Sequence, residues 1–366
     1  FNKHKLKGKF IFSSNVLAVG DFMSTSEPTK EGEKASEAMK IPAFLDCVLT
    51  AKANTVLYDN LTLKEVSGKV IIKDEKATLE NVKTSIFGGQ IGLNGNVSTK
   101  TKVPTFAMDL NMSQVNINET FTQLDMMKSI APIANIINGK LNSTISVAGN
   151  LDSKEMTPNL KSITGDIAAQ LLSTTINSSN STLLNALDNQ IKFIDLNKIN
   201  LNDLKTSLTF QDGKVNVKPF DINYQDISMT IGGTHGFDQS MNYNLKFDVP
   251  AKYLGTETTA LINKLSPADA ANFKSIPITA MLTGNFTNPK VSTDIKQATT
   301  KLVTQLVEKK KKKLINQGTS ALTDLINQNT KPADTTKPTQ PKSKEDQIKD
   351  QVKDGLNSLF NKNKKE

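Results

Sequence analysis

Residues 63–95 read LKEVSGKVIIKDEKATLENVKTSIFGGQIGLNG, and residues 203–233 read DLKTSLTFQDGKVNVKPFDINYQDISMTIGG. The two stretches align at one constant offset, and each predicts a strand, a tight turn and two further strands. The aligned positions keep their character: Val66 and Leu204, Val70 and Leu208, Ile72 and Phe210, Asp74 and Asp212, Lys76 and Lys214, Leu79 and Val217, Val82 and Phe220, Ile91 and Met229. One structural unit is therefore used at least twice.

A shorter signature occurs three times, each time at the end of an alternating run. Gly-Asn-apolar stands at 95–97, 149–151 and 284–286, and a proline follows it at Pro104, Pro158 and Pro289. Such glycines usually mark turns and bulges of β-proteins. We expect further turns at Asp212-Gly213 and at the pairs 88–89, 94–95 and 232–233.

Apolar and polar residues alternate with a period of two through most of residues 50–294. TFAMDLNM (105–112), for example, places Phe106 and Met108 on one face of a strand and Thr105 and Asp109 on the other. The chain is therefore predicted to be mainly β, with a long, mostly antiparallel sheet. The same alternation would also close a β-sandwich core, so periodicity leaves an open and a closed sheet both possible.

Few segments predict helices within this β-region, which we place at residues 1–295. Helical spacing appears in residues 117–137, with Asn118 as a candidate cap, and in the shorter segments 181–190 and 266–275. Residues 23–40 are charged and poor in apolar side chains, so we interpret them as a mobile loop. We expect the two shorter helices, at 181–190 and 266–275, to lie over an edge or a face of the sheet.

The C-terminal tail has a different composition. We expect an amphipathic, lysine-rich helix at 296–328, a disordered linker at 329–346 and a short basic helix at 347–366. From residue 296 onward there are 16 lysines and 8 acidic residues, whereas the preceding part is almost neutral. All 45 cationic residues are lysines, and tryptophan is absent. Without arginine, and with aromatic residues at 5%, nucleic-acid binding is not expected.

No catalytic or metal-binding motif is present. Cys47 is the single cysteine and is expected to be a small buried apolar residue; His4 and His235 are expected on the surface or in loops. Neither a phosphate-binding loop nor a nucleophile elbow occurs, and the paired acidic residues fall in predicted turns. We therefore expect no enzyme activity, no cofactor and no metal.

The order of features from 61 to 96 resembles the C-terminal region of the AsmA family. The residues that carry the resemblance are those of LTLKEVSG (61–68), then Val70 and Ile72, and the Phe87-Gly88-Gly89 of SIFGGQIGLNGN. The segments 95–117, 139–171 and 282–295 are similar to later parts of the same pattern. The resemblance covers roughly residues 50–295.

This resemblance implies a repeating β-groove: a curved sheet whose open, apolar concave face carries lipid acyl chains. AsmA-like and TamB-like proteins are anchored in the inner membrane of Gram-negative bacteria and project into the periplasm. The resemblance thus implies a periplasmic segment, tethered by an N-terminal anchor upstream of Phe1, that takes part in phospholipid transport and outer-membrane biogenesis. The family has no catalytic residues to transfer. The groove candidates are Val70, Ile72, Ile91, Leu93, Phe106, Met108, Leu110, Met112, Ile145, Val147, Leu208, Phe210, Ile227, Met229, Ile231, Tyr243, Leu245 and Phe247.

An open groove makes physical sense for lipid transfer. Each acyl methylene removed from water is worth about 0.8 kcal/mol, so an apolar strip offsets most of the cost of extracting a lipid. Two other functions stay open at this point. One is a scaffold or chaperone-like factor for the assembly of outer-membrane proteins, and the other is a passive surface or adhesive β-protein.

The basic tail also has two interpretations. It is either a solvated charged helix or a segment that binds an anionic membrane surface. The candidates for membrane contact are Leu302, Leu306, Lys309, Lys310, Lys311, Lys312, Lys313, Leu356 and Phe360.

Overall fold

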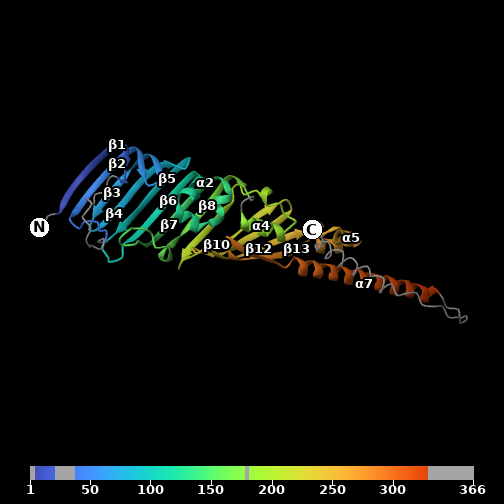
Figure 1. Cartoon of the computed structure of the whole chain (residues 1–366). Helices are drawn as coiled ribbons and strands as arrows, with labels where there is room; N and C mark the ends of the chain where they lie inside the picture. Colours follow the sequence, from blue (N-terminus) through green and yellow to red (C-terminus); the bar gives the residue numbers. More distant parts are fainter. Residues whose placement is uncertain (1–4, 21–37, 178–180, 329–366) are drawn as a thin grey trace. The chain divides into compact units, whose positions relative to one another are not determined.

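The computed structural model describes residues 5–20, 38–177 and 181–328, with side chains up to residue 316 except at 125, 126, 129, 135, 257 and 261, and it is mainly β (Figure 1). The strands are β1 (Leu6–Ala18), β2 (Leu45–Tyr58), β3 (Leu61–Lys73), β4 (Lys76–Ile86), β5 (Gly89–Ser98), β6 (Thr105–Asn116), β7 (Ile137–Asn150), β8 (Thr164–Ile176), β9 (Lys205–Gln211), β10 (Lys214–Tyr224), β11 (Ile227–Gly236), β12 (Ser240–Pro250), β13 (Ser275–Asn285) and β14 (Asn288–Thr293). The α-helices are α2 (Ile117–Gln123), α3 (Asp125–Ile130), α4 (Thr182–Gln190), α5 (Thr256–Asn263), α6 (Pro267–Ala270) and α7 (Ile295–Gln328). The 3₁₀ helices are η1 (Pro132–Ile136), η2 (Leu160–Ser162), η3 (Leu196–Lys198), η4 (Ala251–Leu254) and η5 (Ala271–Phe273).

The strands form one curved sheet in which spatial order follows sequence order from β1 to β14. Because β1 and β14 lie at the two ends of that order, the sheet does not close, as the groove interpretation requires. From β2 to β11 each strand is antiparallel to the next. The β1–β2 pair is parallel, which the predicted antiparallel sheet did not include. Parallel neighbours need a long return connection, and residues 19–44 provide its length.

The chain divides into two compact units. The first takes in residues up to 246 together with 280–292, and the second takes in 247–279 and the chain from 293 onward. The first unit contains β1–β11 and therefore most of the alternating sequence. The second contains α5, α6 and α7.

The repeat predicted from the two aligned stretches is confirmed in the strand boundaries. β4 and β10 begin and end at equivalent positions, and β5 and β11 begin at equivalent positions. Each copy also has a bulge at the same place, between Leu79 and Val82 in β4 and between Val217 and Phe220 in β10. A bulge adds a residue and bends the strand. Both copies are therefore bent at the same position of the unit.

Gly95 and Gly233 lie opposite these two bulges, inside β5 and β11. The predicted turns at 94–95 and 232–233 are therefore wrong. A Cβ on Gly95 would lie 2.6 Å from the carbonyl oxygen of Ala107, and one on Gly233 would lie 2.4 Å from that of Asn242. These glycines allow a close approach of the next strand, which is the other role of glycine in a sheet.

The two bulges differ in one hydrogen bond. In β4 the backbone N–H of Asn81 donates to Oδ1 of Asn94 at 2.7 Å. The equivalent residues in the second copy are Pro219, which has no N–H, and Gly232, which has no side-chain acceptor. Donor and acceptor are lost together, so this exchange leaves neither group without its partner.

The Gly-Asn-apolar signature closes a strand each time, at the ends of β5, β7 and β13. Gly149 shows why glycine stands there. It lies opposite Phe106, and a Cβ on Gly149 would be 3.2 Å from the Phe106 ring and from Oγ of Ser162. The signature therefore marks a strand end where a side chain would crowd its neighbours.

The segment predicted to be one helix at 117–137 is three short helices, α2, α3 and η1; we call residues 117–136 the helical insert. Its cap is Asn116, whose Oδ1 accepts the N–H of Glu119 at 3.0 Å, so the expected cap at Asn118 is wrong. Pro132 begins η1, where its missing N–H costs nothing. The other predicted helices are found as α4 and as α6 with η5.

The predicted tail helix is found as α7, which has 34 residues. The linker at 329–346, the basic helix at 347–366 and most of the loop at 23–40 lie outside the described residues. Among the helices of the described residues, none is long and apolar enough to cross a membrane.

Candidate apolar binding face

One row of directly paired residues crosses eleven strands of the first unit. Paired residues of neighbouring strands point to the same face of a sheet, so the row defines a single face, which we call the apolar face. From β1 to β11 the row is Phe10, Leu49, Val70, Leu79, Gly95, Met108, Val147, Gly165, Phe210, Val215 and His235. Up to β10 every member is apolar or glycine.

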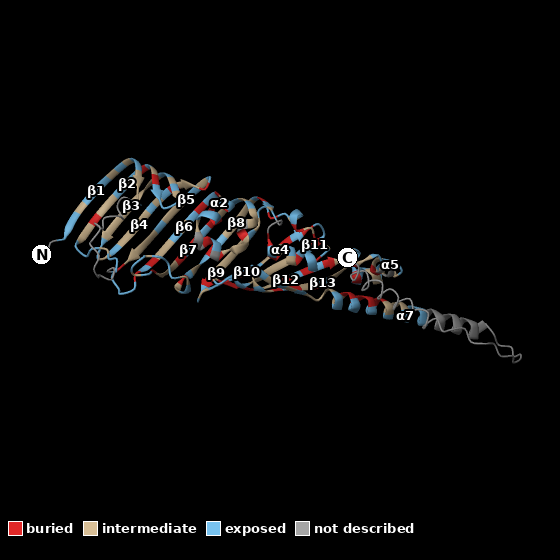
Figure 2. Cartoon of the chain, viewed as in Figure 1, coloured by how far each residue is buried: buried red, intermediate tan, exposed pale blue. Residues whose placement is uncertain are grey.

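Solvent exposure falls along this row. Phe10 is 48% exposed, and Leu49, Val70, Leu79 and Met108 are half-buried. From β7 onward the side chains of the row are buried, with Phe210 at 3% and Val215 at 0%. Figure 2 shows the same trend, because β1–β5 are mostly intermediate or exposed. The apolar face is therefore open over β1–β5 and covered farther along.

The predicted groove residues of β3–β11 all lie on the apolar face. Together with the three candidates on β12, they fall into two groups. Those that remain half-buried are Val70, Ile72, Ile91, Leu93, Met108, Leu110, Leu208, Ile231 and Tyr243. Those that are buried are Phe106, Met112, Ile145, Val147, Phe210, Ile227, Met229, Leu245 and Phe247. Phe247 belongs to the second unit.

The helical insert covers the middle of the apolar face. Its side chains Ile117, Phe121, Met127 and Ile130 are buried in one cluster with residues of β6–β10. The strand residues of that cluster include Phe106, Met112, Val115, Leu141, Ile145, Val147, Ile167, Phe210, Val215 and Val217. The insert makes this part of the sheet a two-layered core. The sequence predicted helical structure in this segment, but it did not show that the segment covers the sheet.

The sheet also holds the insert by polar contacts, one at the end of each short helix. The last residues of α2, α3 and η1 are Gln123, Ile130 and Ile136. Their carbonyl oxygens accept hydrogen bonds from Asn60 Nδ2 (3.4 Å), His235 Nε2 (2.9 Å) and the backbone N–H of Asn177 (2.9 Å), respectively. The last carbonyls of a helix have no partner within it. These contacts therefore supply donors to acceptors that the helices themselves leave without a partner.

His235 ends the row on β11 and is 3% exposed, so its predicted position on the surface or in a loop is wrong. The carbonyl oxygen of Ile130 can only accept a hydrogen bond, so Nε2 of His235 is protonated and is the donor. In the tautomer with its proton on Nε2, Nδ1 accepts the hydrogen bond of the Tyr243 hydroxyl at 2.8 Å. Burial raises the pKa of Tyr243, which keeps that hydroxyl protonated. The Phe286 ring stands edge-on to the imidazole.

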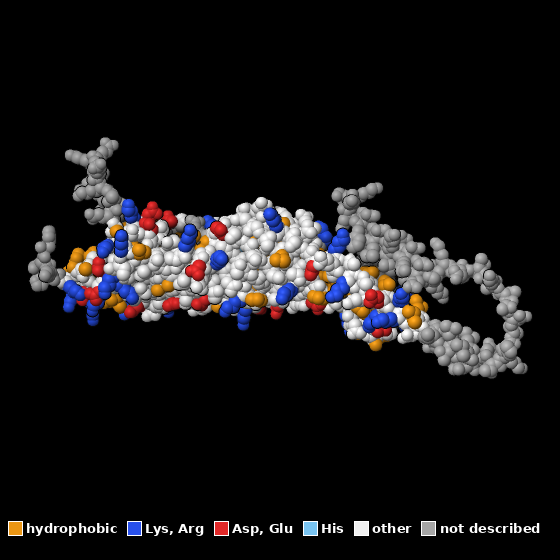
Figure 3. Space-filling view, turned by 90° about the horizontal axis from the view of Figure 1, so that it is seen from below, with side chains coloured by type: hydrophobic (Ala, Val, Ile, Leu, Met, Phe, Trp, Pro, Cys, Tyr) orange, Lys and Arg blue, Asp and Glu red, His pale blue; other side chains and the backbone are white. Residues whose placement is uncertain are grey.

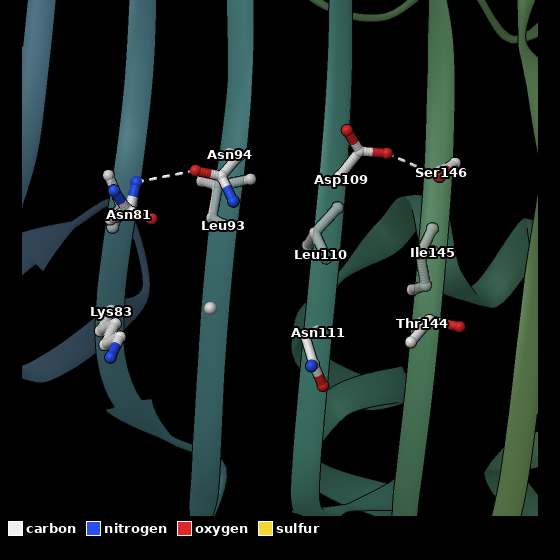
Figure 4. A pocket seen from close by; sticks show the side chains of 12 residues that line it. Asn81, Lys83, Leu93, Asn94, Asp109, Leu110, Asn111, Thr144, Ile145 and Ser146 are labelled. Atoms are coloured by element: carbon white, nitrogen blue, oxygen red, sulfur yellow. Dashed lines mark hydrogen bonds between the residues drawn. The ribbon is translucent and has the colours of Figure 1, made fainter.

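The opposite face of the sheet is polar and carries a shallow depression of about 290 Å³. Its polar lining residues are Asn81, Lys83, Asn94, Asp109, Asn111, Thr144 and Ser146. Gly92 lies between Lys83 and Asn111, and its missing side chain opens the depression. Asp109 accepts a hydrogen bond from Ser146, and Asn94 accepts one from Asn81 (Figure 4). We assign no ligand to this depression because its side chains are exposed and partly bonded to one another.

The membrane-surface candidates on α7 also fall into a buried or half-buried group and an exposed group. Leu302 and Leu306 are 1% and 2% exposed, so they pack within the second unit and do not face solvent. Lys309 forms an ion pair with Asp269 at 2.9 Å and lies 5.2 Å from the centre of the Phe273 ring. The hydrogen bond from Lys309 lowers the pKa of the Asp269 carboxyl most, and the hydrogen bond from Ser266 lowers it further.

The rest of the predicted basic surface begins one residue later. Lys310 is half-buried, Lys311, Lys312 and Lys313 are exposed, and Leu314 is 41% exposed. Leu356 and Phe360 lie outside the described residues. A membrane contact through this helix would therefore start beyond Lys309.

The surface of the described chain carries charged side chains and exposed apolar side chains. In the view of Figure 3, lysines and acidic residues are spread over the surface, and the β1 end is one of the places where hydrophobic side chains gather. Exposed apolar residues at the β1 end include Leu6, Phe10, Ile11 and Phe44.

Within the described ranges, no three His, Cys, Asp or Glu side chains are grouped so that they could hold a metal ion. Cys47 is buried, as predicted.

No family model, curated protein or solved structure matches the chain.

Proposed function

We propose that this chain is a non-catalytic, AsmA-like lipid-binding segment whose open apolar face holds acyl chains. The observation that carries the proposal is the exposure of the row over β1–β5, where Phe10, Leu49, Val70 and Leu79 are still reached by solvent. A wholly apolar strip offers no hydrogen-bond partner, so hydrocarbon is the ligand that loses least on binding there. The same reasoning favours tails over headgroups as the part that is recognised.

The size of the open face suits an acyl chain. Strands lie about 4.8 Å apart, so the row from β1 to β6 spans about 24 Å. Half of a bilayer's hydrocarbon core is about 15 Å thick, which is the depth of one layer of tails. One tail therefore fits on the open face, and each methylene in contact contributes about 0.8 kcal/mol.

From the AsmA resemblance we also propose a cellular role. The segment would work in the periplasm of a Gram-negative bacterium, tethered to the inner membrane, in phospholipid transport between membranes and outer-membrane maintenance. Phospholipids or other acyl lipids are its partners in this proposal.

Photocrosslinking at repeat-equivalent positions tests lipid binding. A benzophenone amino acid replaces Leu79 in one variant and Val217, its equivalent in the second copy of the repeat, in the other. We expect the first to capture phospholipid when the protein is purified from bacteria and the second to capture little, because Val217 is only 8% exposed. Absence of lipid at both positions, together with lipid-free protein in native mass spectra, would sink the proposal.

A second candidate is a scaffold for the assembly of outer-membrane proteins. The observation that favours it is β1, which has 13 residues and pairs only with β2 within the described sheet. A strand edge of this length can pair with a strand from another chain. Crosslinks from β1 to β-barrel precursors, without lipid on the apolar face, would favour the scaffold over the lipid carrier.

We also propose that the basic part of α7 contacts an anionic membrane surface. Lysines near such a surface gain about 1 kcal/mol each. The test compares sedimentation with anionic vesicles for the full chain and for a Lys312→Glu, Lys313→Glu variant. Equal binding of the two would exclude this contact.

A further inference from the structure

We propose that the helical insert sets the length of the acyl chain that the apolar face accepts. This inference rests on the proposed lipid binding and goes beyond it, because it names the structural feature that ends the site. The insert would act as a wall at β6, so that carbons beyond the wall gain no contact with the protein.

The first support is the sharp change along the row. Met108 on β6 is still half-buried, and its partner Val147 on β7 is 5% exposed. The neighbouring row behaves in the same way, since half-buried Leu110 pairs with Ile145 at 7%. The open strip therefore ends within one strand spacing, at the strands whose buried side chains share one cluster with the insert.

The second support is that the wall is held at several points. Ile117, Phe121 and Ile130 are buried in the cluster under the insert. Asn60, His235 and Asn177 hold the carbonyl ends of its three helices. A tail that moved under the insert would have to displace these contacts together. It is therefore more favourable for a longer tail to turn away into solvent.

The third support is that the insert also limits the strip at the end near the β4–β5 turn. Phe87 in that turn is buried in the insert's cluster, and Leu61, Ile86 and Ile91 pack against it. The backbone N–H of Asn116 donates to the carbonyl oxygen of Phe87 at 2.7 Å. An acyl chain that lies across the strands and one that lies along them therefore both meet the helical insert.

A series of unbranched fatty acids, lengthened by two carbons at a time, tests the wall. We measure their dissociation constants for the full chain by competition with a fluorescent fatty acid. Each methylene on the strip should tighten binding about four-fold. The plot of log Kd against chain length should then break and become flat at the length that reaches the insert.

Two variants and one control connect the break to the insert. Phe121→Ala removes a buried side chain of the wall, and His235→Val removes the donor to Ile130; both should move the break to longer chains. Leu187→Ala removes a side chain of α4 that is 6% exposed and lies outside the row, and it should leave the break in place.

The outcomes separate this inference from the proposed function. Binding that tightens steadily up to the longest chain, or a break that neither insert variant moves, overturns the wall and leaves lipid binding intact. Failure of all lengths to bind overturns the proposed function itself. As an independent readout, a diazirine at the methyl end of a long fatty acid should label residues 117–136 or β6. Labelling of Phe210 or Val215 instead would show that tails pass beneath the insert.

Discussion

β3–β5 and β9–β11 are two copies of one unit, yet their apolar sides have different surroundings. At Ile72, Ala77, Leu79 and Ile91 the first copy is half-buried, whereas the equivalent Phe210, Val215, Val217 and Met229 are all buried. The bulges, the opposing glycines and most strand boundaries are the same in both. Phe210, Val215 and Val217 of the second copy share one buried cluster with the helical insert, whereas Ile72, Ala77 and Leu79 of the first copy do not belong to it.

The position of Val97 and His235 shows how the second copy is adapted to its cover. The two residues are equivalent in the repeat and lie on the apolar face. Val97 is half-buried and packs at the margin of the cluster, where an apolar side chain suffices. Where the insert packs on the apolar face, a donor is needed for the carbonyl at the end of α3, and His235 provides it. The cover thus explains the one polar residue of the row.

The largest expected difference between the copies is in core packing. Phe210→Ala should lower the free energy of unfolding by about 3–5 kcal/mol, because it leaves a cavity in a covered region. Ile72→Ala, at the equivalent position, should cost less than about 2 kcal/mol, since water already reaches that side chain. Denaturant titration of both variants measures this. Equal losses would contradict the division into a covered and an open copy.

Replacing His235 should have the next largest effect on the free energy of unfolding. His235→Val introduces the residue of the open copy and leaves the buried carbonyl of Ile130 without its donor, at a cost of about 1–3 kcal/mol. Amide hydrogen exchange should accelerate in residues 117–136. Tyr243→Phe is the matched control, since it keeps the bond to Ile130, and it should cost less. If exchange in the insert stays unchanged in His235→Val, the bond does not hold the insert.

The two glycines opposite the bulges should both resist substitution, because the close strand approach does not depend on the cover. Gly95→Ala and Gly233→Ala should each cost more than about 1 kcal/mol, since the added Cβ meets backbone of the next strand. Gly92→Ala is the control, because the nearest atom to its Cβ, the carbonyl oxygen of Asn111, is 4.0 Å away. Thermal unfolding of the three variants gives the comparison. A tolerated Gly95→Ala would mean that only the covered copy is tightly packed at the bulge.

The smallest effect is expected at the exposed turn between β3 and β4. The Lys5 ammonium, 2.8 Å from Asp74, lowers the pKa of that carboxyl by its hydrogen bond and its charge, and Lys73 and Lys100 add to the effect. Because the pKa of Asp74 is lower in the folded state, its carboxylate contributes to the stability of the fold at pH values above the ordinary pKa of an aspartate. This stabilisation is lost as the pH falls through the lowered value.

Lys5→Met should raise the pKa of Asp74 toward its ordinary value, with little change in stability because both groups are exposed. An NMR titration of the carboxyl measures it. Lys192→Met, which lies far away in the sequence, is the control and should leave Asp74 unchanged. An unmoved pKa in Lys5→Met would show that Lys5 does not pair with Asp74 in solution.

Much of the fold was predictable because it depends on local patterns. Alternation with a period of two predicts which residues share a face, and the strands of the first unit confirm it for every groove candidate in β3–β11. The constant offset between the two aligned stretches predicts equivalent strands and turns. The predictions that were wrong, the turns at 94–95 and 232–233 and the cap at Asn118, concern glycine and asparagine. These residues serve several local geometries equally well, and only the neighbouring strand selects one.

By itself, the sequence determined the order of apolar and polar faces, the repeated unit and the absence of familiar catalytic motifs. Only the tertiary structure decided which apolar residues are covered and which are open to a ligand. The physical reason is that burial depends on partners distant in the chain. Ile130 and His235 are 105 residues apart, and no local pattern in either segment shows that they meet. The open strip over β1–β5 is what remains of the apolar face once those distant partners have packed.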